Sequence, residues 1–210
     1  MPKLKPDVQR ARREHIMDAA EKCFAERGFH RSSIHDICRE AGVSPGALYV
    51  YFNSKEALIA GIVERDRADF ADRFATLAEA PDFLEALREL AEHYFVHEPP
   101  HKRRMCIEIG LESTRDPRIG QIFREVDEFI GASFEKLFQK LKDEGRIAPV
   151  FDVPKLIQIF ELLGDGLFWR RAVNPDFDAR AMVSVVIETF RLLLNPVDPA
   201  RSGSANAREE

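Results

Sequence analysis

Apolar residues recur every three to four positions along most of this chain, the spacing that places them on one face of an α-helix. The sixth apolar stretch also fits the alternation of a strand, but no partner strand is predicted nearby, so we interpret it as a helix. The pattern therefore predicts an all-α fold. The nine helices are expected at about residues 8–27, 34–41, 45–52, 55–77, 83–98, 105–111, 118–144, 153–171 and 178–194.

Two of these helices are separated by a very short turn. The apolar face that ends at Ala41 is followed by Gly42, and glycine readily adopts the positive φ that follows many helix C-termini. Ser44 suits the N-cap of the next helix, and Pro45 suits its first turn. This arrangement is typical of a helix-turn-helix motif, which we predict at about residues 33–52.

The second helix of the motif has an inner and an outer side. Leu48 and Phe52 lie four positions apart and are predicted to face the core. Small residues on the other side let the backbone approach a DNA groove, and tyrosine hydroxyls can reach phosphate oxygens. The residues expected on this outer side are Pro45, Gly46, Ala47, Tyr49, Val50 and Tyr51.

The start of the following helix is a second candidate for contact with DNA. Asn53 is predicted as its N-cap, with the acidic Glu56 three residues later. The unpaired N–H groups of a first helical turn attract anions, and the Lys55 ammonium adds a positive charge there. This helix end is therefore predicted to bind phosphate.

Two runs, EAGVS at residues 40–44 and LYVYFNSKEAL at residues 48–58, resemble the DNA-binding domain of the TetR/AcrR repressors. The resemblance covers roughly residues 8–60. An isolated Gly-Val-Ser also fits a plain solvated helical hairpin, but the whole run does not. The resemblance implies that residues 44–51 form the recognition helix. It also implies phosphate contacts by Ser33, Tyr49, Tyr51 and Lys55.

The chain departs from the family pattern at two positions. The family often has a basic or polar residue where this chain has Pro45, and a histidine where it has Val50. Both residues here are apolar. Direct reading of bases by hydrogen bonds from this helix is therefore expected to be sparse.

The resemblance further implies a homodimer with a variable ligand-binding half. The last two helices would pair with their symmetry mates, and Gly164 and Gly166 would allow close approach. By pattern alone, the apolar stripes of these helices fit an intrachain core equally well. The expected parts are an N-terminal three-helix DNA-binding domain at 1–54, a C-terminal helical effector-binding and dimerisation domain at 55–195, and a disordered tail at 196–210.

The net charge of the chain is -5, but it is unevenly distributed. Residues 1–55 carry ten Lys or Arg against seven Asp or Glu, whereas the remainder carries 21 against 29. A basic N-terminal part favours contact with phosphates. The first residues form either an arm along the DNA or a frayed terminus. Their basic side chains are Lys3, Lys5, Arg10, Arg12 and Arg13.

Other classes of protein find little support. No stretch reaches the roughly eighteen unbroken apolar residues of a membrane span, and the N-terminus lacks a signal-peptide core, so a cytoplasmic protein without a membrane partner is expected. Cys23, Cys38 and Cys106 form no paired framework. No phosphate-binding loop, dinucleotide fingerprint or nucleophile elbow is present, so neither an enzyme activity nor a cofactor is expected.

One zinc-peptidase signature, HExxH, occurs at residues 97–101. Its chemistry requires both histidines on one face of a continuous helix, which Pro99 and Pro100 would break. A metal sensor built from His93, His97 and His101 is an alternative, but no thiolate or carboxylate is placed to complete the shell. We therefore predict no metal site.

The effector site is predicted in the second half, where most of the sixteen phenylalanines lie. Aromatic stripes at helical spacing are usually core, and a ligand pocket between helices would use the same faces. Glu108 is a candidate contact for a cationic or hydroxylated compound, although a solvated carboxylate explains it equally simply. The candidate pocket residues are Met105, Glu108, Phe123, Phe134, Phe160, Phe168 and Trp169.

These features together predict a ligand-responsive transcriptional repressor. It would bind a pseudo-palindromic double-stranded DNA operator as a homodimer, and a small hydrophobic effector would release it. Two alternatives remain open. One is a helical small-molecule-binding protein without an operator, and the other is a ligand-independent DNA-binding protein or an activator.

Overall fold

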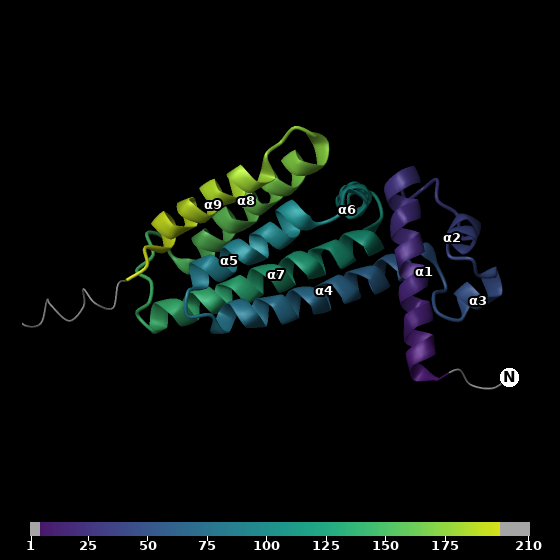
Figure 1. The fold of residues 1–210 in the computed structure, drawn as a ribbon, viewed down its shortest axis with the longest axis horizontal. Helices are drawn as coiled ribbons and strands as arrows, with labels where there is room; N and C mark the ends of the chain where they lie inside the picture. The colour runs from purple at the N-terminus through teal and green to yellow at the C-terminus, as the bar shows by residue number, and fades with distance from the viewer. Residues whose placement is uncertain (1–4, 198–210) are drawn as a thin grey trace, which may run out of the picture. The chain divides into compact units, whose positions relative to one another are not determined.

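The computed structural model describes residues 5–197, which are almost entirely helical (Figure 1). One isolated β-bridge joins Ile147 to Pro196. None of the described helices is both long and apolar enough to cross a membrane. This architecture confirms the predicted all-α fold. The helices are α1 (Pro6–Arg27), α2 (Ile34–Glu40), α3 (Pro45–Tyr49), α4 (Lys55–Glu79), α5 (Phe83–Glu92), α6 (Pro100–Ser113), α7 (Pro117–Asp143), α8 (Val153–Val173) and α9 (Ala179–Leu194), with a π-helical turn η1 (His93–His97).

Packing divides the chain into two compact units. Among the described residues, unit 1 comprises 5–71 and 98–126, and unit 2 comprises 72–97 and 127–197. Helices α4 and α7 each contribute residues to both units. The predicted functional division after residue 54 is a different one, and it stays a prediction.

Unit 1 contains the three N-terminal helices and one helix from much later in the chain. The core around Phe24, Ile37 and Leu48 also includes Met105 and Ile109 of α6. Helix α6 lies against α1 (Figure 1). The core of the helix-turn-helix is therefore completed by residues about 70 positions downstream of α2.

Unit 2 contains a group of aromatic rings in tilted and edge-to-face contact. Phe134 of α7 lies 5.0 Å from Phe74 and 4.0 Å from Phe160, measured between ring centroids. Phe160 of α8 in turn lies 5.2 Å from Phe190 of α9. These contacts tie α4, α7, α8 and α9 together with aromatic surface, which contributes strongly to core stability.

Most helix ends lie within two residues of the predicted ones, but α3 ends at Tyr49 rather than at 52, and α6 spans Pro100–Ser113 rather than 105–111. Helix α1 begins at Pro6 rather than at 8, with Lys5 as N-cap, because proline suits the first position of a helix. Helix α4 is capped by Ser54, whose hydroxyl oxygen accepts from Ala57 N–H at 3.1 Å, rather than by Asn53.

Residues 196 and 197, which the sequence predicts as part of the tail, pair with the segment at residues 146–147. Val197 N–H donates to the Arg146 carbonyl oxygen at 2.9 Å, which continues the pairing at Pro196. The first two residues of the predicted tail therefore have backbone partners. The remaining tail, 198–210, and Lys3 of the predicted arm lie outside the described residues.

The π-helical turn η1 ends two residues before the first of the two prolines. In an α-helix the Val96 carbonyl would accept from the N–H of residue 100, but Pro100 has none. Arg171 Nη2 donates to this carbonyl instead, at 3.0 Å. His97 therefore ends η1 and His101 belongs to α6. The helix is interrupted inside the HExxH sequence, as the prolines predict.

Candidate DNA-binding site

The turn between α2 and α3 has the geometry that its sequence predicts. Gly42 has φ +60°, a conformation that other residues adopt at a cost. Ser44 caps α3, and its hydroxyl oxygen accepts from Ala47 N–H at 3.2 Å. Val43 N–H donates back to the Cys38 carbonyl oxygen at 3.0 Å. These bonds hold the two helices in a compact helix-turn-helix.

The two sides of α3 differ sharply in exposure. Leu48 is fully buried and Phe52 nearly so, whereas Tyr49 is 53% exposed and Val50 77% exposed. A Cβ added to Gly46 would meet nothing within 4 Å. An exposed valine and tyrosine beside a small residue form a surface that can enter a major groove.

The nine predicted DNA-binding residues belong to one part of unit 1. They occupy the N-cap of α2, the cap and body of α3, and the segment that leads into α4. Within this set Ser33, Ser44, Gly46, Tyr49 and Val50 are exposed. The partly buried members are Pro45, Ala47, Tyr51 and Lys55.

Ser33 is committed to capping α2. Its hydroxyl oxygen accepts from Asp36 N–H at 3.1 Å, and its O–H donates to Asp36 Oδ2 at 2.6 Å. The Ser33 side chain and backbone bonds hold the pKa of Asp36 well below its usual range. Arg27 and Arg39 also bind this carboxylate. A phosphate contact by Ser33 would therefore require its O–H to turn from Asp36 to the phosphate, since phosphate oxygens accept hydrogen bonds.

Lys55 is turned toward its own chain. Its Nζ donates to the Phe29 carbonyl oxygen at 2.7 Å and lies 4.2 Å from the centre of the Phe29 ring. Partial burial lowers the pKa of this lysine. An ammonium group has three N–H donors, so this bond leaves donors for a phosphate.

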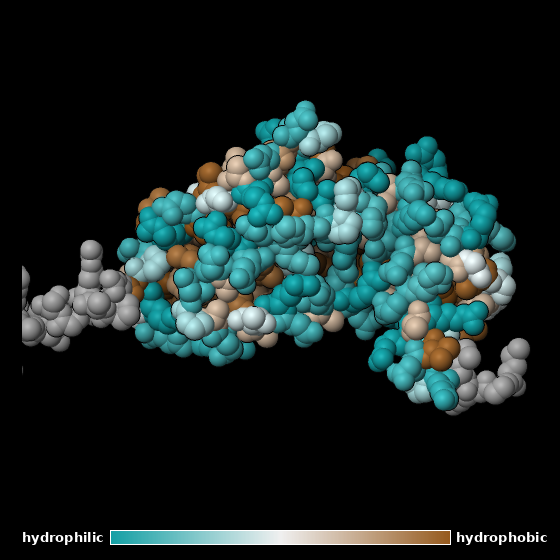
Figure 2. Space-filling model, viewed as in Figure 1, coloured by the Kyte–Doolittle hydropathy of each residue, from teal (hydrophilic) through white to brown (hydrophobic). Residues whose placement is uncertain are grey.

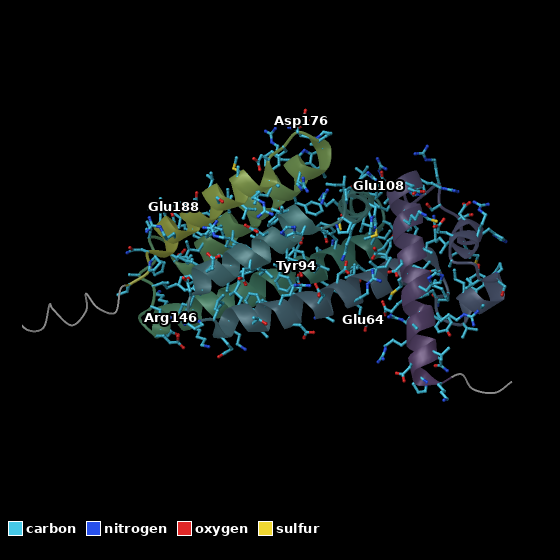
Figure 3. All side chains as sticks on the ribbon, in the orientation of Figure 1. Glu64, Tyr94, Glu108, Arg146, Asp176 and Glu188 are labelled. Atoms are coloured by element: carbon cyan, nitrogen blue, oxygen red, sulfur yellow. The ribbon has the colours of Figure 1, made fainter. Side chains whose placement is uncertain are left out.

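Sequence reasoning missed the contacts of α6 with the segment between α1 and α2. Glu112 is buried, and its Oε2 lies 2.6 Å from Nε2 of His30. Glu108, predicted as a pocket residue, has its carboxylate beside Gly28 (Figure 3). No local pattern relates α6 to this segment, because the contacts are about 80 residues apart in sequence.

The predicted pocket residues do not form a single group. Met105 lies in the core of unit 1, and Glu108 and Phe123 also belong to unit 1. Phe134 and Phe160 stack in the core of unit 2, whereas Trp169 is 54% exposed. Phe168 is partly buried on α8. None of the seven lines the apolar hollow of about 330 Å³ beside Phe151 and Leu162.

The two glycines predicted to favour helix pairing differ in their surroundings. A Cβ on Gly164 would lie 3.9 Å from Cζ of Phe95, so this glycine faces its own chain. A Cβ on Gly166 would meet nothing within 4 Å. Only Gly166 therefore fits the predicted role.

The histidines are similarly separated by the helix break. His97 Nε2 lies 3.9 Å from Glu92 and 3.5 Å from Arg180 Nη2, while His101 begins another helix. Across residues 5–197 no three His, Cys, Asp or Glu side chains are grouped to hold a metal ion.

An exposed helix on a compact helix-turn-helix, within an all-helical chain, defines the class of helix-turn-helix transcriptional regulators. Residues 16–62 match the sequence model of the family described as "Bacterial regulatory proteins, tetR family". The HTH-type transcriptional regulator UidR of Escherichia coli (strain K12) is 31% identical over 137 residues, or 65% of this chain and 69% of UidR. The chain belongs to the TetR family.

Two further relatives extend the match over nearly the whole chain. The HTH-type transcriptional repressor Rv1474c of Mycobacterium tuberculosis is 27% identical over 190 residues, covering 90% of this chain and 97% of that protein. The crystal structure of FadR from Bacillus subtilis in complex with stearoyl-CoA matches with a TM-score of 0.72 at 22% identity, covering 88% of this chain and 99% of FadR. This likeness confirms the fold.

Proposed function

We propose that this protein is a ligand-responsive transcriptional repressor that binds a pseudo-palindromic operator as a homodimer. The observation that carries the proposal is the exposed outer side of α3, where Tyr49 and the C-cap residue Val50 are exposed while Leu48 on the inner side is buried. Two such helices, one from each protomer, would enter successive major grooves about one helical turn apart. As a DNA-binding regulator, the protein would act in the cytoplasm.

The side chains of this surface divide into two roles. Val50 is the candidate for direct reading, since an exposed apolar side chain can contact the methyl group of thymine. Tyr49, Tyr51 and Lys55 are the candidates for phosphate contacts, which fix orientation and carry no sequence information. With few polar groups on the helix, part of the specificity would come from the shape of the DNA.

The dimer is proposed to form through α8 and α9. Leu162, Gly166, Trp169 and Val173 follow spacings of four, three and four, so they share one face of α8. The three large residues of this face are exposed. On α9 the exposed apolar residues Met182, Val185 and Leu192 also share one face.

Figure 2 shows apolar residues interrupting the hydrophilic surface over α8 and α9. Exposed apolar faces on two packed helices favour burial against a second copy, as in a four-helix bundle. The intrachain alternative, that these stripes are only core, accounts for Val183, Ile187 and Phe190, which are buried. It does not account for the exposed stripes.

The effector is proposed to be a small hydrophobic compound that binds in the C-terminal half. The rings of Phe134, Phe160 and Phe190 contact one another, and they offer aromatic surface against which an apolar compound could pack. FadR, which has the same fold, is described in complex with stearoyl-CoA. An effector that favours a protomer geometry unsuited to the operator would release the DNA in proportion to that preference.

The stoichiometry of a complex with operator DNA tests this proposal. Sedimentation of the protein with a selected duplex should give two protomers per inverted repeat. One protomer per duplex, with no dependence on the second half-site, would contradict the homodimeric repressor. Equal affinity for unrelated duplexes would favour a small-molecule-binding protein without an operator.

A further inference from the structure

A cluster of charged groups lies inside unit 1, where α1, α4 and α6 meet. Arg65 of α4 is its centre, with Nη1 at 2.8 Å from Asp18 and 3.3 Å from Glu14, both on α1. The same guanidinium binds Glu21 through Nη2, and its Nε lies 3.7 Å from Asp66. One guanidinium therefore serves four carboxylates.

The cluster continues to α6 through Asp66. Lys102 Nζ lies 2.9 Å from Asp66 Oδ1 and 3.7 Å from Oε1 of Glu98. Arg65 and Lys102 thus contact five carboxylates between them, and Arg103 adds a third positive charge near Glu98. By contrast, the exposed Glu64 (Figure 3) pairs with Arg13 at 3.1 Å on the same α1–α4 seam.

Glu21 is the member of this cluster that is least able to remain charged. It is only 5% exposed, whereas Asp18, which shares its cation, is largely exposed. Water can compensate the excess negative charge at the exposed carboxylates but not at a buried one. Protonation of Glu21 is therefore the change that most easily removes the excess negative charge from the buried part of the cluster.

We propose that Glu21 holds a proton in the folded protein and that this proton strengthens the packing of α1 against α4 and α6. The charged form leaves a buried carboxylate competing for Arg65, while the neutral form keeps a hydrogen bond to it and removes one negative charge. The DNA-binding unit would then be held together more firmly in mildly acidic conditions. The inference does not depend on the proposed repressor function, since it concerns the stability of unit 1.

Some of the groups that face Glu21 raise its pKa, and others lower it. The pKa of Glu21 is raised to about 7: burial is the largest cause, Asp66 and Asp18 also raise the pKa, and Arg65 and Lys102 lower it. Burial also raises the pKa of Glu98. The thiol of Cys106 has a pKa of about 12, again because it is buried, so it stays neutral.

The sign of the effect follows from linkage. The folded-state pKa of Glu21 lies above its ordinary value of 4.5, so the native state binds the proton more tightly than the unfolded state does. The added stability is fully present below about pH 4.5 and is lost as the pH rises through 7. Glu98 also has a raised pKa, so it too stabilises the fold more at low pH than at high pH. The test therefore compares the pH response of the chain with and without Glu21.

Hydrogen exchange on the full chain tests the proposal. The opening equilibrium constant of α1 amides, corrected for the intrinsic exchange rate, should be about tenfold larger at pH 8 than at pH 6 through Glu21. Glu21→Gln, which mimics the protonated form, should remove this factor. Glu64→Gln, on the same seam, should keep it. The same pH response in Glu21→Gln and wild type would overturn the proposal.

A second measurement covers the case in which Glu21→Gln does not fold. Carbon-13 NMR of glutamate carboxyl groups in the wild-type chain, with the Glu21 signal assigned through Glu21→Asp, should give a midpoint near 7 for that signal. A midpoint near 4.5 would overturn the proposal. Neither measurement involves DNA, so failure of the repressor proposal would leave both readouts unaffected.

Discussion

The Nζ of Lys55, at the start of α4, donates a hydrogen bond to the Phe29 carbonyl oxygen 26 residues earlier, at a distance of 2.7 Å. This bond joins the first residue of α4 to the segment that precedes α2. Lys55, the candidate for phosphate binding, therefore also stabilises the fold by linking these two segments. Substituting Lys55 should therefore lower both the stability of the protein and its affinity for DNA, because a different contact is lost in each case.

Replacing Lys55 with alanine is expected to have two measurable effects. Loss of the bond to Phe29 should lower the free energy of unfolding by about 1 kcal/mol. Loss of one phosphate contact should weaken binding to all duplexes alike and reduce the salt slope of log K by about one. Titrations by fluorescence anisotropy at several salt concentrations measure the slope. Lys136→Ala, on exposed α7 surface, is the control, and an unchanged slope in Lys55→Ala would remove the phosphate role.

Tyr49 and Val50 are adjacent exposed residues with different predicted roles. Tyr49→Phe removes a hydroxyl and should weaken binding to every sequence by a similar factor. Val50→Ala removes methyl groups from the reading surface and should relax the preference at one base pair of each half-site. Comparing duplexes selected by the two variants separates these effects. If Tyr49→Phe changed the selected sequence, its assignment to the backbone would be wrong.

Two glycines in unit 1 should respond to alanine in opposite ways. Gly28 has φ +78°, and a Cβ there would lie 2.9 Å from Glu108 Oε2, so Gly28→Ala should cost about 1–3 kcal/mol. Gly46 is helical and faces open space, so Gly46→Ala should stabilise the protein by about 0.5 kcal/mol. The added methyl group would nevertheless lie between α3 and the groove of bound DNA, so it should weaken DNA binding. Denaturant unfolding and duplex affinity measure both effects, and Gly46→Ala with full affinity would mean that this tip does not approach DNA.

Charge placed on the apolar faces of α8 and α9 should separate the dimer. Burial of one leucine side chain contributes about 1.5–3 kcal/mol and twofold symmetry uses each twice, so Leu162→Asp or Leu192→Asp should raise the dimer dissociation constant about 100-fold or more. Sedimentation velocity over a range of concentrations measures the constant. Leu111→Asp alters an exposed leucine of unit 1 and should not change it. Dimers that survive both α8 and α9 changes would require another interface.

Helices with local signals were predictable from the sequence. Gly42 and the cap Ser44 act within a few residues of themselves, so the predicted turn and the start of α3 were confirmed. The π-helical turn was missed because it depends on a distant partner, Arg171, for the carbonyl that Pro100 leaves unpaired.

Long-range packing explains the other differences. Met105 was assigned to a ligand pocket from its place in an apolar stripe, but α6 packs it into the core of the helix-turn-helix unit. The burial of Glu21 was not foreseen either, since it follows from α4 and α6 covering α1 rather than from the local pattern around Glu21. A hydrophobic period indicates which face is buried but not which partner covers it.

Selection of bound duplexes from a random pool at two salt concentrations tests the proposal that the outer side of α3 reads DNA sequence. We expect enrichment of an inverted repeat whose half-sites lie about one helical turn apart and which stays bound at the higher salt. Recovery of unrelated sequences that dissociate at the higher salt would contradict it, because binding would then be electrostatic and independent of α3.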